Sequence, residues 1–133
     1  GNKMAAGFAV ALRNSRADAI TTFIGSAAKL EIYSGTQPAT GGAETTTLAT
    51  FTMGTPFAGA ASAGVLTGTL PADVNASATG TATWARIYKA DGTTFCMDLS
   101  VGTSGTQIIM NSVSLTAGVA CSITAITITE GNA

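Results

Sequence analysis

The stretch TATWARIYKADGTTFCMDLSV, residues 81–101, decides the fold of this chain. Two runs rich in β-branched and aromatic residues flank the pair Asp91-Gly92. An Asp-Gly pair between two such runs is typical of a β-hairpin. The sequence therefore predicts two antiparallel strands joined by a tight turn, and the other segments of the chain are interpreted around them.

The side chains of the second strand alternate between two faces, because a strand has a period of two residues. One face carries only apolar side chains and is expected to be buried: Phe95, Met97, Leu99 and Val101. A two-residue turn at Asp91-Gly92 would place Arg86 among these apolar side chains. An unpaired charge in a protein core is strongly disfavoured, so this register is rejected.

A three-residue loop of Ala90, Asp91 and Gly92 avoids the problem, because Gly92 in a left-handed conformation with a β-bulge shifts the register by one residue. Ala85 and Ile87 then join the buried face. The alternate residues point away from the core, where Arg86 reaches Asp98 across the strands. The outward set is Trp84, Arg86 and Tyr88, with Cys96 and Asp98 beside them.

Two interpretations of this outer stripe, Trp84-Arg86-Tyr88, stay open. Another part of the same chain covers it, or it is a surface for a partner protein. The second interpretation rests on residue type, because Trp, Tyr and Arg are the residues that most often anchor interfaces.

Composition limits the classes of partner. The 133 residues are expected to form a single domain over 1–133. Only 10% of residues are charged and the net charge is -1, which favours neither nucleic acid nor an anionic membrane as a partner. The sequence has no run of eighteen apolar residues that could form a membrane span. A surface rich in Ala, Thr, Gly and Ser suits a protein that neighbours cover in an assembly.

One helix is predicted, over residues 6–24, and Gly25 ends it. Its apolar stripe is expected to face the sheet and consists of Phe8, Leu12, Ala19, Ile20, Phe23 and Ile24. Arg13, Arg16 and Asp18 occupy much of the remaining surface. Such a helix either covers one end or face of the sheet or docks on a neighbouring subunit as an arm.

Five further strands are predicted, at 29–33, 48–53, 65–70, 108–115 and 119–129. In the last strand the apolar parity switches, which calls either for a bulge near Thr124-Ala125 or for a strand that serves two packing layers. With the hairpin, the chain is mainly β. We expect an antiparallel β-sandwich or jelly roll of about seven strands with one N-terminal α-helix.

The residues that usually carry catalysis are sparse. The chain contains no histidine, which removes the commonest general base and metal ligand, and its carboxylates are scattered. Cys96 and Cys121 are too few for a zinc site with four cysteine or histidine ligands. We therefore expect no enzymatic activity, no metal and no cofactor.

The order of the segments resembles a family of small virion structural proteins of tailed bacteriophages. The resemblance is carried by residues 12–20 leading into 29–38, by 85–88 ahead of a Gly-Thr-Thr turn, by 100–105 and by 126–133. It implies a protein of the virion, in the head or the tail, and it includes no catalytic signature.

Two functions follow as expectations. The first is a head decoration, or cement, protein that binds the outer shell across major capsid subunits, as an oligomer or as many copies in a lattice. Its expected contact residues are Arg13, Arg16, Trp84, Arg86 and Tyr88. The alternative is a tail-associated or fibre-associated module that binds a host surface saccharide, with Trp84 and Tyr88 as stacking platforms.

Overall fold

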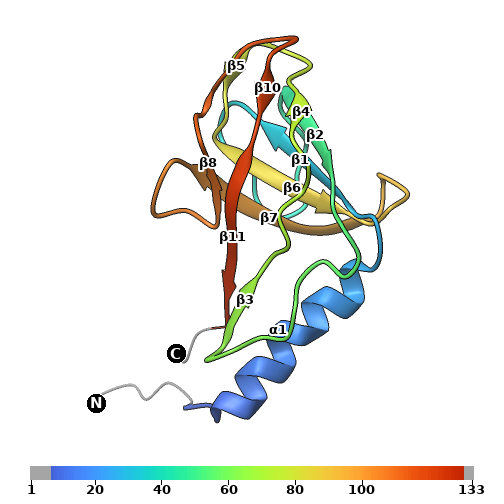
Figure 1. Cartoon of the computed structure of the whole chain (residues 1–133), viewed down its shortest axis with the longest axis vertical. Helices are drawn as coiled ribbons and strands as arrows, with labels where there is room; N and C mark the ends of the chain where they lie inside the picture. Colours follow the sequence, from blue (N-terminus) through green and yellow to red (C-terminus); the bar gives the residue numbers. More distant parts are fainter. Residues whose placement is uncertain (1–6, 131–133) are drawn as a thin grey trace.

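The structure, a computed structural model, describes residues 7–130 (Figure 1). Within that range the chain forms one helix and eleven strands. Their bounds are α1 Val10–Ile24, β1 Lys29–Tyr33, β2 Thr47–Thr52, β3 Val65–Thr67, β4 Val74–Asn75, β5 Gly80–Thr81, β6 Trp84–Tyr88, β7 Phe95–Gly102, β8 Ile108–Met110, β9 Ser114–Leu115, β10 Ala120–Cys121 and β11 Ile123–Thr129.

The architecture is mainly β with one N-terminal helix, as predicted, and a seven-stranded sheet in the order β2-β1-β6-β7-β8-β11-β3 dominates it. In Figure 1, β11 runs upright in front of β6 and β7, so that one half of the sheet crosses over the other as in a β-sandwich. Two short pairs, β10-β4 and β5-β9, lie at the end of the molecule away from α1. The apolar side chains of both halves form one buried cluster between them, which includes Leu30, Leu66, Leu99 and Ile126.

The sheet is mixed rather than purely antiparallel, which corrects the prediction. Strands β7 and β8 run parallel and pair Val101 with Ile108. The loop between them folds back because Gln107 and Ser100 exchange two hydrogen bonds, each 3.1 Å, between a side chain and a backbone N–H. The chain thereby returns to the level of Val101 and continues in its earlier direction.

The predicted hairpin forms, and its central parity is confirmed. Ala85 lies opposite Leu99, Ile87 lies opposite Met97, and all four face the core cluster or pack against it. Gly92 has a φ of 73°, in the left-handed region as predicted. The turn is longer than predicted, because its closing backbone hydrogen bond runs from Lys89 N–H to the Thr94 carbonyl.

The bulge lies in the second strand rather than in the turn, and this reverses two side chains. The register shifts between Ile87 and Tyr88, so Tyr88 lies opposite Phe95 and Cys96 is the extra residue. Phe95, predicted to be in the core, therefore lies on the outer face beneath the Arg86 guanidinium, 5.1 Å from it. Cys96, predicted to point outward, packs against the core cluster instead.

The other strands follow the predictions to different degrees. Strand β1 has the predicted bounds, with Leu30 and Ile32 buried. The register shift predicted near Thr124-Ala125 is confirmed, because it falls between Ile123 and Ala125. The segment predicted as one strand over 108–115 instead contributes β8 to the large sheet and β9 to a separate pair, and β4 and β5 were not predicted.

Helix α1 ends at Gly25 as predicted, with a φ of 77° there; residue 6, the predicted start, lies outside the described residues. The predicted apolar stripe is only partly buried. Ile24 is buried and Ile20 packs against the core, but Leu12 is 47% exposed and Phe23 is 54% exposed. No helix in the described part of the chain is long and apolar enough to cross a membrane.

Candidate interaction surface

Trp84, Arg86 and Tyr88 lie on the face of the sheet opposite the core, as predicted, but they are not exposed. Their exposed fractions are 0%, 4% and 6%. Residues 34–46, which connect β1 to β2, cover them. The stripe is therefore covered by the chain itself, and the interpretation of these three residues as a free contact surface is wrong for this structure.

A buried ion pair holds the covering segment. Arg86 Nε lies 2.6 Å from Asp98 Oδ1, and Arg86 Nη2 lies 3.2 Å from Asp98 Oδ2. Arg86 Nη2 also donates to the Gly42 carbonyl at 2.8 Å, and the Gly41 N–H donates to Asp98 Oδ2 at 3.0 Å. The hydrogen bond to Asp98 raises the pKa of the Arg86 guanidinium above its ordinary value. Both charges are thus paired and also bonded to the backbone that covers them.

The aromatic members of the stripe are also satisfied within the chain. The Trp84 ring stacks on Tyr33 with centroids 4.3 Å apart, and Trp84 Nε1 donates to Thr45 Oγ1 at 2.9 Å. The Tyr88 hydroxyl donates to Glu44, and the Tyr33 hydroxyl donates to Glu31 at 2.9 Å. Burial raises the pKa of both tyrosines, so the phenols stay neutral.

The polar side chains of α1 also bond within the chain. Arg13 Nε donates to the Glu130 carbonyl at 2.9 Å, and Arg13 Nη2 donates to the Ala63 carbonyl at 3.2 Å. The guanidinium lies against Gly64, where a Cβ would be 2.5 Å from Nη2. Gly64 also has a φ of 76°, so both its backbone and its neighbour require the absence of a side chain.

Two further polar residues of α1 accept hydrogen bonds from the same loop. The Gly64 N–H donates to Asn14 Oδ1 and the Ala61 N–H donates to Asp18 Oδ1, each at 2.7 Å. Thus α1 docks on residues 61–64 through polar contacts beside buried Ala17. This docking was not predicted, although Arg13, Asn14 and Asp18 share a helix face with Ala17 by their spacing.

Polar docking turns much of the predicted apolar stripe outward. Leu12, Ala19 and Phe23 are exposed on the flank of α1 that does not touch residues 61–64. Lys89 Nζ donates to the Phe23 carbonyl at 2.5 Å and lies 4.2 Å from the centre of its ring. Arg16, the other predicted contact residue of α1, pairs with Glu130 at 2.9 Å yet keeps a half-exposed side chain.

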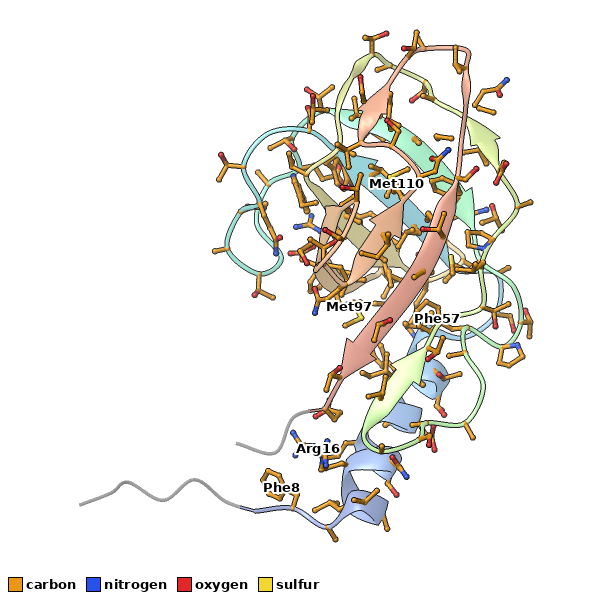
Figure 2. The ribbon with its side chains drawn as sticks, turned by 60° about the vertical axis from the view of Figure 1, so that its left-hand side comes forward. Phe8, Arg16, Phe57, Met97 and Met110 are labelled. Carbon is orange, nitrogen blue, oxygen red and sulfur yellow. The ribbon has the colours of Figure 1, made fainter. Side chains whose placement is uncertain are left out.

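A groove of about 240 Å³ runs between this flank and β7. In Figure 2, Arg16 marks the helix side and Met97 the sheet side of this region. Its lining is largely apolar: Arg16, Ala19, Ile20, Phe23, Ile24, Cys96 and Met97. Burial raises the pKa of the Cys96 thiol, which does not favour a reactive thiolate there.

Residues 7–130 hold no group of three or more Cys, Asp or Glu side chains placed to bind a metal ion. Both cysteines are free thiols. The exposed flank of α1, with the largely apolar groove beside it, is the candidate site.

Comparison of the chain with protein-family models, with curated proteins and with solved structures found no significant match.

Proposed function

We propose that this chain is a head decoration protein of a tailed bacteriophage, which binds the outer shell across major capsid subunits and stabilises it. The resemblance of its segments to small virion proteins suggests the setting. The exposed apolar flank of α1 carries the proposal, because the helix uses polar side chains to dock on its own body and leaves Leu12 and Phe23 in water. Exposed apolar surface of this kind suits a subunit that is covered in an assembly.

The body beneath α1 suits a structural role. A covering segment closes the outer face of β6 and β7, and its polar contacts are made within the chain. Few charges remain for non-specific binding, since only 10% of residues are charged. Many copies on one shell would turn a modest affinity per site into firm attachment.

The alternative function, saccharide binding by a tail module, required Trp84 and Tyr88 to be stacking platforms. Both rings are buried beneath residues 34–46. No observation favours this alternative, and we do not propose it.

Shell binding tests the proposal directly. Heads that lack this chain are mixed with the purified protein, bound copies are counted by quantitative mass spectrometry, and DNA release on heating is recorded. We expect many copies per head and release at a higher temperature. Absence of binding, or only a handful of copies per particle, would reject the decoration role.

A matched pair of variants links the binding to α1. The double variant Leu12→Glu/Phe23→Glu should lose occupancy. The variant Val10→Glu should keep it, because Val10 is a similarly exposed apolar residue outside the flank. Equal occupancy of heads by the two variants would show that the flank with Leu12 and Phe23 does not contact the shell.

A further inference from the structure

Strand β7 has an edge that no other strand covers. On one side β7 pairs with β6 along residues 95–100, but on the other side β8 pairs only with Val101 and Gly102. The first part of β7, residues 95–99, therefore has no neighbouring strand on that side. Such an edge is a template on which a further strand can form.

The open edge presents the backbone of Asp98. The Val101 N–H donates to the Thr83 carbonyl, on the β6 side of the strand. Because the direction of the backbone groups alternates along an antiparallel strand, the N–H and C=O of Asp98 point away from β6. The N–H of Ser100 points the same way and donates to Gln107 Oε1. Neither backbone group of Asp98 has a partner in the described part of the chain.

The exposure of Asp98 agrees with this direction. Its side chain is only 3% exposed, because it pairs with Arg86, yet the residue as a whole is partly exposed. The accessible part of Asp98 is therefore mainly its backbone. An added strand could form two hydrogen bonds there without breaking any bond of the folded chain.

The groove beside β7 suits the side chains of an added strand. Such a strand continues the sheet, so every second side chain lies on the same face as Met97. That face borders the groove, whose opposite wall on α1 includes the exposed Ala19 and Phe23. The lining is largely apolar, so the partner needs apolar side chains at alternate positions.

Charge adds a second requirement on the partner. The groove lining includes Arg16 and no carboxylate. At the Phe23 end lies Lys89, whose Nζ is 4.2 Å from the centre of the ring. Lys89 forms no ion pair with a carboxylate of residues 7–130. An acidic residue of the partner would complement these cations, whereas a basic one would be repelled.

We propose that the open edge of β7 binds an extended segment of a partner protein as an additional strand. The segment carries apolar residues at alternate positions and an acidic residue beside Lys89. The inference rests on the proposed function for the source of the segment, which would be a subunit of the shell. One added strand is a small contact, so its affinity should be modest and firm attachment should require many copies.

Amide hydrogen exchange followed by NMR tests the open edge without a ligand. The Asp98 amide should exchange much faster than the amides of Met97 and Leu99, whose backbone groups face β6. Equal protection of the three amides would overturn the open edge.

A synthetic peptide tests strand addition to the full chain. The probe is a labelled peptide of alternating valine and threonine with aspartate at one end or the other, and fluorescence anisotropy measures its binding. N-methylation along one edge of the peptide should weaken binding by roughly tenfold or more, because it removes the hydrogen bonds to β7. N-methylation along the other edge should change little. No binding, or equal effects of the two modifications, would overturn the proposal.

Matched variants locate the bound peptide. Ala19→Glu should weaken its binding by roughly tenfold or more, because the new carboxylate fills the groove and repels an acidic segment. Ala11→Glu, at an exposed alanine of α1 outside the groove, should leave binding unchanged. Lys89→Glu should reverse the preference, so that a peptide with lysine in place of aspartate binds better. Circular dichroism checks that each variant is folded, and equal effects of the two alanine variants would contradict the groove as the site.

The outcomes separate the two proposals. A chain that binds heads but no peptide overturns strand addition and leaves the decoration role. A chain that binds the peptide but no heads overturns the decoration role and leaves strand addition. Self-association in sedimentation velocity that the peptide reverses would show that a second copy, rather than a partner protein, occupies the edge.

Discussion

At the scale of single residues, the Arg86–Asp98 ion pair joins neighbouring strands and also holds the covering segment. Its two side chains are almost entirely buried, and each also bonds to the backbone of the covering segment. A charge of this kind is tolerated in a protein interior only while its partners are in place. The pair therefore fixes residues 41–42 over the sheet as well as joining β6 to β7.

Replacing Asp98 should be costly because it leaves a buried guanidinium unpaired. We expect Asp98→Asn to lower the free energy of unfolding by roughly 3–5 kcal/mol, measured by urea denaturation. The matched control is Asp73→Asn at an exposed carboxylate, which should change stability by less than about 0.5 kcal/mol. Similar small losses for both variants would mean that the Arg86–Asp98 pair is solvated in solution.

The two tyrosines predict a pH dependence with a defined sign. Burial raises the pKa of Tyr33 and of Tyr88, and these are the chain's only tyrosines. Above the ordinary tyrosine pKa of about 10, the unfolded state loses both protons while the folded state keeps them. The contribution of the two tyrosines to the free energy of unfolding should be fully present below that pH. As the pH rises further, the free energy of unfolding should fall by up to about 2.7 kcal/mol per pH unit through these two groups.

Urea denaturation at several pH values above 9 measures that slope. The double variant Tyr33→Phe/Tyr88→Phe should show a shallower fall, although its stability at neutral pH drops through lost hydrogen bonds. An unchanged slope in the variant would show that the phenols ionise equally in both states.

At the scale of elements, α1 shows that the face of a helix with the predicted apolar stripe is not always the face that is buried. Three polar side chains, Arg13, Asn14 and Asp18, bond to residues 61–64 and 130. These bonds, together with buried Ala17 and Ile24, orient the helix and turn Leu12 and Phe23 outward. Hydrogen bonds to charged groups are individually strong enough to compete with the burial of one apolar side chain.

Gly64 tests this docking. Gly64→Ala should lower the free energy of unfolding by about 1–2 kcal/mol, because alanine is strained in the left-handed conformation of this position. The substitution should lower the free energy of unfolding by roughly 1–3 kcal/mol more, because the new Cβ displaces the Arg13 guanidinium from its carbonyl acceptors. Gly118→Ala is the control, since its φ is 81° and no atom lies near its Cβ position. Hydrogen exchange should show faster opening of α1 in Gly64→Ala alone, and equal behaviour of the two variants would contradict the docking.

At the scale of the whole molecule, the large sheet separates two buried regions. The apolar cluster fills the space between the crossing halves, and the smaller aromatic and ionic layer lies under residues 34–46. Trp84 belongs to the second region, while its neighbour Ala85 belongs to the first. Because one strand contributes to both, the two regions are expected to unfold together.

Trp84 is the chain's only tryptophan, and its ring lies beneath the covering segment, where it bonds to Thr45. Tryptophan fluorescence therefore monitors the environment of this segment. In urea, the transition followed by its fluorescence should coincide with the transition followed by far-UV circular dichroism. A fluorescence change at clearly lower urea would show that residues 34–46 detach before the sheet unfolds. The variant Asp98→Asn should separate the two transitions, because it releases the segment from its buried partner.

The sequence alone determined the local features that depend on near neighbours. Four such features follow from periodicity and turn chemistry: the bounds of β1, the end of α1 at Gly25, the left-handed Gly92 and the shared face of Ala85 and Ile87. The register shift near Thr124-Ala125 follows in the same way. Only the tertiary structure decided which of the remaining faces are covered. Residues 34–46 and 61–64 lie far in sequence from the side chains that they contact, and no local pattern specifies which loop will cover the outer face of β6 or bond to the polar side chains of α1.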